Sequence, residues 1–384
     1  MKVLFVSTAP LEYGSSSNMR NIALLKGFIE NNHDVYTLTP EPQTDSALYD
    51  DTICDIKITQ KYFIPFSTVH SAVTIKKNKK SRIKKFLFSF AKKLKVYDFR
   101  SSLANTTIII KEKFDIIISS SDPKSSHLVA ENLIKNNPGI TNKWIQYWGD
   151  PFADDINNKG FVPKCWIKRE EKRILGLADY ILYVSPFTLK KQQELYSEYS
   201  NKMLFLPIPY NKQIIYSKTK NRNIKIGYFG DYYSRNRSII ALYNTIKNRK
   251  EELVICGNSD LQLEEHKNIK IMPRISLEEV RKQEENSDIL VCICNKKGTQ
   301  IPGKIYHYSA TNKPIMILLD GDQQGDLKDY FMSFDRFIIC ENNEQDISKA
   351  LNRFKKCNTD YSPLDKLKPQ NLVQKLIKKV NNEK

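Results

Sequence analysis

Residues 224–231, IKIGYFGD, decide how this chain is divided. The apolar run that ends in a glycine and an aspartate is typical of a buried strand that passes into a loop. It lies past the middle of a chain of 384 residues, and a second series of strands and helices begins with it. Since single hydrophobic cores stop growing at roughly 250–300 residues, the sequence predicts two domains.

Strand-like apolar runs alternate with helical stretches on both sides of that point. Before it we expect strands at 2–8, 33–39, 114–121, 143–150, 178–185 and 202–209, with helices at 19–30 and 127–135. From it onward we expect strands at 224–231, 252–258, 268–274, 287–294 and 313–319, with a helix at 237–248. This alternation predicts an α/β protein in which helices cover parallel sheets. Because it occurs twice, we expect two Rossmann-like domains.

The boundary between the two series is a polar stretch, residues 207–223, that contains two prolines. Such segments are typical of domain linkers. We therefore expect a first domain over 1–208, a linker over 209–222, a second domain over 223–365 and a closing helix over 366–384.

Charge and composition limit the partners of the protein. The formal net charge is +18 at pH 7, which favours phosphates, anionic lipids or nucleic acid as partners. The seven cysteines include no Cys-x-x-Cys pair and the five histidines are far apart, so neither a metal site nor a disulfide framework is expected. No zinc finger, RNA-binding sheet motif or helix-turn-helix is found, which argues against nucleic acid as the partner. A reducing cytoplasm suits this pattern.

Residues 76–97 contain many Lys and Arg and no Asp or Glu. Leu87, Phe90, Leu94 and Tyr97 recur at helical spacing, which predicts an amphipathic helix on an anionic membrane surface. The alternative is a helix packed on the first domain with a basic outer face. No run approaches the roughly 20 apolar residues of a spanning helix, and the first residues lack the pattern of a signal peptide. We therefore expect a cytoplasmic protein, peripherally bound to the inner face of the cytoplasmic membrane.

The segment from 301 to 320, IPGKIYHYSATNKPIMILLD, carries the strongest local signal for a ligand. Pro302 suits the first turn of a helix, Gly303 lets an anion approach the backbone, and Lys304 adds a full charge. The alternative is an ordinary loop-to-helix turn. In open parallel sheets ligands bind at the carboxyl ends of the strands, and this turn follows such an end.

These residues, PGKIYHYSATNKPIMIL, resemble a segment of the nucleotide-sugar glycosyltransferases with the GT-B fold, of the retaining family-4 type. The same resemblance extends, in order, over most of the chain. It includes VSTAPLEYGSSSNMRNIALLKGFIENNHDVYTLT (6–39), FDIIISSSDPKSSHLVAENL (114–133), WIQYWGDPF (144–152), IKIGYFGDYYSRNR (224–237), ELVICGN (252–258) and SLEEVRKQEENSDILVCIC (276–294).

The resemblance implies a GT-B fold, with two Rossmann-like domains whose parallel sheets face a central cleft. The closing helix is expected to cross back to the first domain. The activity implied is transfer of a sugar, with retention and without metal, to a saccharide or lipid-linked acceptor in cell-surface polysaccharide synthesis. The donor would be a UDP- or GDP-linked sugar, a substrate, and no cofactor is expected.

Site residues also follow from the resemblance. The diphosphate would be held by Arg235, Arg237, Lys304 and the backbone at Pro302 and Gly303. The base and ribose would rest near Gly257, Arg274 and Ile275. Gly230 would belong to the donor site just before the basic loop, and Gly14 and Ser15 would lie near the donor from the other domain. Thr299 and His307 stand where the family carries two glutamates that contact the sugar and the ribose; a Thr or neutral His side chain still forms hydrogen bonds there.

Asp150 and His127 are the catalytic candidates. Asp150 ends an expected strand, where its carboxylate suits a base for the acceptor hydroxyl or a ligand of a sugar hydroxyl. His127 follows another strand end, and a packed histidine at the start of a helix is the equally simple interpretation. His33 is expected to be structural.

Two other functions remain open at this point. One is a nucleotide-sugar epimerase or hydrolase on the same fold. The other is a non-catalytic subunit of a polysaccharide assembly complex, which Thr299 and His307 favour because neither supplies a fixed negative charge.

Overall fold

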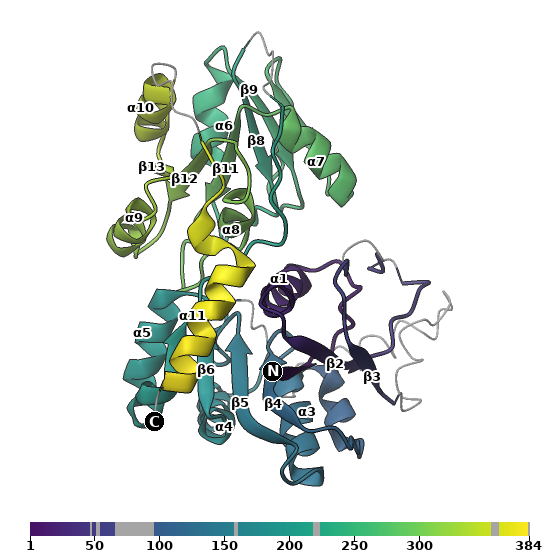
Figure 1. The fold of residues 1–384 in the computed structure, drawn as a ribbon. Helices are drawn as coiled ribbons and strands as arrows, with labels where there is room; N and C mark the ends of the chain where they lie inside the picture. Colours follow the sequence, from purple (N-terminus) through teal and green to yellow (C-terminus); the bar gives the residue numbers. More distant parts are fainter. Residues whose placement is uncertain are drawn as a thin grey trace, which may run out of the picture. The chain divides into compact units, whose positions relative to one another are not determined.

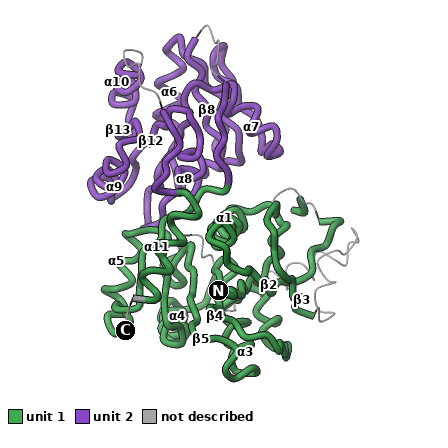
Figure 2. The backbone as a smooth tube through the Cα atoms, in the orientation of Figure 1, with its two compact units in different colours: residues 1–211, 368–384 green, residues 212–367 purple. Residues whose placement is uncertain are grey.

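The computed structural model describes residues 1–46, 48–50, 54–65, 96–156, 160–217, 223–354 and 361–382. The chain forms two compact units, which Figure 2 shows in different colours. Unit 1 contains residues 1–211 and 368–384, and unit 2 contains residues 212–367.

Unit 1 is built on a parallel sheet of seven strands (Figure 1). Its order is β3 (Gln60–Ile64), β2 (Asp34–Pro40), β1 (Lys2–Val6), β4 (Phe114–Ser120), β5 (Thr141–Trp148), β6 (Tyr180–Tyr183) and β7 (Met203–Phe205). Its helices are α1 (Ser16–Glu30), η2 (Phe99–Asn105), α3 (Ser125–Asn136), α4 (Lys164–Leu177), α5 (Pro186–Leu195), η3 (Ser197–Lys202) and α11 (Pro369–Asn382).

Unit 2 repeats the plan with a parallel sheet of six strands. Its order is β10 (Ile269–Met272), β9 (Glu252–Cys256), β8 (Lys225–Phe229), β11 (Ile289–Ile293), β12 (Ile315–Leu319) and β13 (Ile338–Glu341). Its helices are α6 (Ile240–Lys247), α7 (Leu277–Glu285), α8 (Lys304–Tyr308), α9 (Gln324–Met332), α10 (Glu344–Phe354) and η4 (Asp365–Leu367).

The central strands are continuous apolar runs because helices cover the sheet on both faces. All five residues of β11 and of β12 are buried. In unit 1, Leu4 is paired with Tyr36 on one side and Ile117 on the other. The prediction of an α/β protein with two parallel sheets is confirmed. Strands β3 and β13 were not predicted, because both are edge strands with partly exposed residues and therefore weaker apolar patterns.

Both sheets reverse their strand order at the first strand. In unit 1 the reversal lies between β1 and β4, and in unit 2 it lies between β8 and β11. At such a point the loops leave the sheet in opposite directions and open a crevice at the carboxyl edge, where ligands bind in this class of fold. The topology therefore indicates the carboxyl edge of each sheet as the position of a ligand site.

The last helix, α11, returns to unit 1, as predicted, and packs on α1 (Figure 1). A Cβ atom at Gly27 of α1 would overlap the Pro369 carbonyl and lie 2.6 Å from Cγ2 of Val373, so glycine permits this close approach. The Nζ of Lys143 donates to the carbonyl of Val380 at 2.6 Å. The chain therefore crosses from unit 1 to unit 2 and ends on unit 1.

Candidate functional site

In unit 2 the loops that follow β8 and β9 meet at two glycines. The N–H of Gly230 donates to the carbonyl of Cys256 at 2.8 Å. A Cβ atom at Gly257 would overlap the carbonyl oxygen of Gly230, so only glycine allows the two loops to approach this closely. Both residues belong to the predicted site, and we call this pair of glycines at the carboxyl edge of the sheet the glycine floor.

Lys304 extends over this floor from α8. Its Cε lies 3.5 Å from where a Cβ atom of Gly230 would be, and its Nζ lies 5.7 Å from the ring centroid of Tyr308. Burial lowers the pKa of Lys304, while the Glu284 carboxylate acts in the opposite direction. Among the residues that the structure describes, none forms a hydrogen bond or ion pair with its ammonium. An unpaired, partly desolvated cation of this kind is suited to an anionic ligand.

The anion site predicted from the sequence includes a helix N-terminus. The structure shows that α8 has only five residues, with Gly303 as its N-cap and Pro302 before it. Two of its first N–H groups, those of Ile305 and Tyr306, donate to the carbonyls of Pro302 and Gly303. The positive charge at this position therefore comes mainly from side chains.

Arg237 is the second cation beside the floor. Its Nε donates to Oδ1 of Asn295 at 2.9 Å, and a second guanidinium nitrogen donates to the carbonyl of Asp231 at 3.4 Å. The amide of Asn295 in turn donates to the carbonyl of Gln300 at 3.0 Å. These bonds connect the loops after β8 and β11, the two strands between which the strand order of the sheet reverses (the switch point). They fix a guanidinium where the fold class binds its ligands.

The remaining predicted residues of unit 2 lie around these two cations. Arg274 is exposed but close enough for its charge to lower the pKa of Lys304, and Ile275 is half-buried ahead of α7. Arg235 is exposed and near Asp260. Arg274 therefore joins the group around Lys304, whereas no interaction among the described residues joins Arg235 to it.

The environments of His307 and Thr299, two of the predicted site residues, differ. Burial lowers the pKa of His307 to about 4, so its imidazole is neutral at pH 7. Thr299 is buried, and the next residue, Gln300, is only 9% exposed. Both amide atoms of the Gln300 side chain are buried and have no hydrogen-bond partner among the described residues. A buried amide without partners is costly, and a bound polar ligand would satisfy it.

Unit 1 brings Asp150 into a group of charges that the sequence did not reveal. Oxygens of Asp122, Asp150 and Asp155 lie within 4.8 Å of one another. The ammonium of Lys124 is 2.8 Å from Oδ1 of Asp122 and 2.7 Å from Oδ2 of Asp155. Burial and the two neighbouring carboxylates raise the pKa of Asp150 to about 7. Asp150 can therefore exchange a proton near neutral pH.

Arg20 of α1 completes this group. It is 6% exposed, its guanidinium lies 5.0 Å from the ring centroid of Tyr147, and it donates to the carbonyl of Ser121. A Cβ atom at Gly149 would overlap the guanidinium, so the residue before Asp150 is small for a steric reason. Arg20, Asp122 and Lys124 lie in segments that carry the resemblance but were not predicted as site residues, and Asp155 lies outside those segments. Their positions after β4 and β5 could have suggested all but Arg20.

The other predicted residues of unit 1 have structural partners. Ser15 is the N-cap of α1 and accepts from the N–H of Asn18 at 3.1 Å, and Gly14 donates to the carbonyl of Leu48. His127 is fully buried, and its Nδ1 lies 2.7 Å from the Ser119 hydroxyl. Its ring packs against that of Trp148 at 4.3 Å, and burial lowers its pKa to about 3. These contacts place the imidazole in the core of unit 1.

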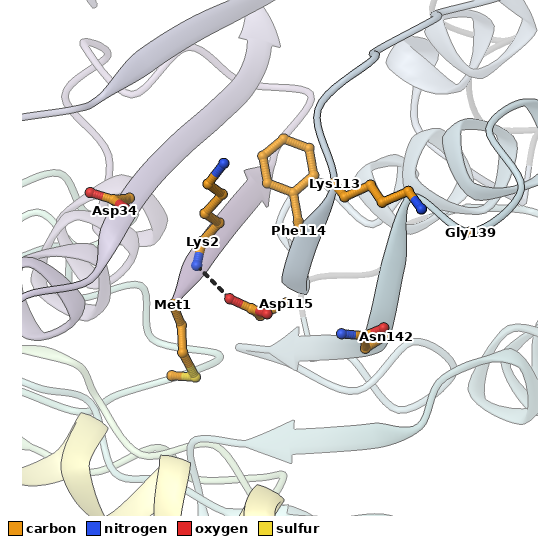
Figure 3. A pocket seen from close by; sticks show the side chains of 8 residues that line it. All are labelled: Met1, Lys2, Asp34, Lys113, Phe114, Asp115, Gly139 and Asn142. Atoms are coloured by element: carbon orange, nitrogen blue, oxygen red, sulfur yellow. Dashed lines mark hydrogen bonds between the residues drawn. The ribbon is translucent and has the colours of Figure 1, made fainter.

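A separate hollow lies at the opposite edge of the unit 1 sheet (Figure 3). Its volume is ≈ 470 Å³, and it is lined by Met1, Lys2, Asp34, Lys113, Phe114, Asp115, Gly139 and Asn142. The N–H of Lys2 donates to Asp115 across it at 2.8 Å. Because these residues lie at the amino ends of the strands, the hollow contains none of the predicted site residues.

The predicted membrane segment falls mostly on residues 66–95, which lie outside the described residues. Tyr97 is described: its hydroxyl donates to Glu170 at 2.9 Å, and its ring lies 4.9 Å from that of Phe152. This end of the expected apolar stripe thus packs on unit 1. Of the helices that the structure describes, none is long and apolar enough to cross a bilayer.

Comparison with known proteins finds likeness in structure alone. No protein-family model and no curated protein matches the sequence. Among solved structures, the catalytic domain of starch synthase IV from Arabidopsis thaliana, bound to ADP and acarbose, is 12% identical with a TM-score of 0.57. The match covers 99% of this chain and 98% of that one. A glycosyltransferase from Rickettsia africae is 12% identical with a TM-score of 0.53, over 100% and 99%.

A UDP-N-acetylglucosamine 2-epimerase is similar to the same degree, 10% identical with a TM-score of 0.53 over 100% of this chain and 96% of that one. The chain has a GT-B-like fold. The predicted fold is thereby confirmed. Sequence identities this low do not show that the chain belongs to the family-4 enzymes, and they identify no substrate.

Proposed function

We propose that this protein is a glycosyltransferase that takes a sugar from a nucleoside diphosphate and passes it to a saccharide or lipid-linked acceptor. The observation that carries the proposal is the Lys304 ammonium, which has no ion pair or hydrogen bond among the described residues and lies near enough to Arg237 for that charge to lower its pKa. Two neighbouring cations beside the loops after β8 and β9 suit a diphosphate, which is also where charge develops when the glycosyl bond breaks. The buried Gln300 amide supplies hydrogen bonds for a neutral part of the same ligand.

The other predicted residues receive roles within this proposal. Gly257, Arg274 and Ile275 would lie along the nucleoside, Arg235 would add a distant charge, and Thr299 and His307 would contact sugar and ribose hydroxyls. Asp150 would contact the acceptor in unit 1, where Gly14 and Ser15 also lie. His127 would act only by supporting that edge from the core. Retention at the anomeric carbon and independence of metal remain part of the proposal through the resemblance.

Calorimetric titration with UDP, GDP, ADP and CMP tests the site before any sugar is known. We expect one nucleoside diphosphate to bind with a dissociation constant in the micromolar range and to weaken at higher salt, because charge-assisted contacts dominate. A panel of the corresponding nucleotide sugars, read by release of free nucleotide with and without oligosaccharide acceptors, then tests transfer. If no nucleotide or nucleotide sugar binds, the non-catalytic subunit becomes the better interpretation.

The epimerase alternative has support from the structural likeness to a UDP-N-acetylglucosamine 2-epimerase. The donor alone separates the two functions. An epimerase changes the sugar without any acceptor, whereas a transferase needs the acceptor for rapid release of nucleotide. Proton NMR of the nucleotide sugar during incubation distinguishes these results, and change at the sugar carbon without acceptor would replace the transferase proposal.

We further propose that the protein works in the cytoplasm at the inner face of the membrane, through residues 76–97. The net charge of +18 and the lysine-rich segment support this. Flotation with vesicles of anionic and neutral lipid is the test. Each basic residue near an anionic surface contributes about 1 kcal/mol, so changing Lys84, Lys85, Lys92 and Lys93 to Glu should abolish flotation. Binding that survives this change, or that ignores lipid charge, contradicts the proposal.

A further inference from the structure

The charge group at the carboxyl edge of the unit 1 sheet has an uneven arrangement. Lys124 forms ion pairs with Asp122 and Asp155, whose side chains are 33% and 14% exposed. The third carboxylate, Asp150, lies within the same 4.8 Å set of oxygens, and no ion pair joins it to a described residue. One ammonium thus serves two carboxylates and leaves the third without a direct counter-ion.

Arg20 limits the negative charge from the other side. Its guanidinium is nine-tenths buried, packs where Gly149 has no side chain, and keeps a buried Nε without a hydrogen-bond partner among the described residues. An incompletely paired, buried donor beside the three carboxylates indicates a place built for a further polar group. When Asp150 is protonated, the two positive charges of Lys124 and Arg20 balance the two negative charges of Asp122 and Asp155.

We propose that Lys124 and Asp155 are positioning residues that prepare Asp150 to accept the proton of the acceptor hydroxyl, an inference that rests on the proposed glycosyl transfer. Lys124 holds its two partners in place and lowers the pKa of Asp122. Asp155 supplies a fixed negative charge next to Asp150 and so strengthens Asp150 as a base. Asp150 is the one of the three that exchanges a proton.

The step is a simple exchange of bonds. The acceptor oxygen forms a bond to the anomeric carbon on the face from which the diphosphate departs, so that the configuration is retained, while the acceptor proton passes to an oxygen of Asp150. The bond from that carbon to the diphosphate oxygen breaks, and its electron pair leaves with the nucleoside diphosphate. Asp150 afterwards releases the proton to water. No oxidant, reductant or further reactant is needed.

Groups on several elements face Asp150, and their signs fit this role. Asp122 and Asp155 raise its pKa, whereas Lys124 and Arg20 lower it. His127 on α3 is neutral because burial lowers its pKa to about 3. Glu171 on α4 is engaged by the N–H groups of Phe152 and Ala153 and by the Tyr196 hydroxyl. Lys124 and Asp155 therefore act on Asp150 with opposite signs, which makes their roles separable.

The test is the pH dependence of kcat/KM for the acceptor in the wild type and in three variants. In the wild type we expect activity to fall below about pH 7 as Asp150 becomes protonated. Asp155→Asn removes a negative neighbour and should move this fall to lower pH, by about half a pH unit or more. Lys124→Gln removes a positive neighbour and should move it to higher pH. Asp150→Asn should abolish this fall in activity at low pH and reduce kcat/KM roughly 100-fold or more.

The matched control is Asp154→Asn, the adjacent aspartate, whose ion pairs go to Lys164 and Lys191. This variant should leave the pH dependence unchanged. The inference would be overturned if the pH at which kcat/KM falls moved in the same direction in Asp155→Asn and Lys124→Gln, or moved in neither variant. If Lys124→Gln does not fold, the comparison of Asp155→Asn with Asp154→Asn still decides it.

A second readout separates this inference from the proposed function. The carboxyl carbons of aspartates labelled with ¹³C report the titration of Asp150 directly, assigned by its loss in Asp150→Asn. A titration near pH 7 that moves oppositely in the two variants supports the roles of Lys124 and Asp155 whether or not the assay shows transfer. Without transfer to any acceptor the proposed function fails and the proton-accepting role fails with it. A titration near the ordinary pH of an aspartate overturns the inference even if transfer is observed.

Discussion

The carboxyl edges of the two sheets have the same topology and different chemistry. In unit 2, Lys304 lies over the glycine at position 230 with Arg237 nearby, and the buried Gln300 amide has no hydrogen-bond partner among the described residues. In unit 1, three aspartates share one close lysine and a buried arginine. The first arrangement suits the binding of an anion, and the second suits the movement of a proton. A repeated scaffold therefore fixes where a site forms, while a few side chains decide its chemistry.

The largest effect should come from the cations of unit 2. Lys304→Ala and Arg237→Ala each remove a charge-assisted contact worth roughly 1.5–3 kcal/mol, so each should weaken nucleoside diphosphate binding 10-fold or more. The double variant should weaken it further. Calorimetry measures this, and Lys297→Ala, an exposed lysine of the same loop region, is the control that should bind normally. Equal affinity of Lys304→Ala and wild type would remove the contrast between the two edges.

A smaller effect should follow from filling the glycine floor. Gly257→Ala places a methyl group on the carbonyl of Gly230, and overpacking of this kind costs about 1–3 kcal/mol. We expect a lower melting temperature and weaker nucleotide binding, measured by thermal unfolding and calorimetry. Gly325→Ala is the matched control, because no atom lies within 4 Å of its added Cβ and alanine favours a helix such as α9. Similar losses in both variants would show that the close approach of the loops is not the cause.

The smallest effect concerns stability and pH in unit 1. The pKa of Asp150 is about 7 in the folded state, above the ordinary value near 4 of an unfolded chain. The folded protein therefore holds this proton more tightly, and stability falls as pH rises from about 4 to about 7. Asp150→Asn removes this loss, so its melting temperature should exceed that of wild type by a few degrees at pH 8 and by less at pH 5. An equal gain at both values would contradict the raised pKa, and Asp154→Asn serves as the control.

The carboxyl edges of the two sheets differ in how many of their site residues could be predicted from the sequence. In unit 2 the candidate residues stand directly after strands or in one short segment, so sequence order places them together. Asn295 and Gln300 were not predicted as site residues although both follow β11. No local pattern distinguishes a buried amide from an ordinary loop residue. In unit 1 only Asp150 was singled out among the charges. Its partners come from α1, from the loop after β4 and from the loop after β5.

The sequence by itself determined the two series of strands and helices, the parallel sheets and the strand ends where ligands belong. It could do so because buried strands and amphipathic helices leave apolar patterns of different period along the chain. The tertiary structure alone decided that Lys124 joins two aspartates, that His127 is packed in the core, and that Arg20 needs a glycine beside Asp150. These facts depend on residues up to 130 positions apart (20 to 150), and no local pattern records which loops the fold brings together.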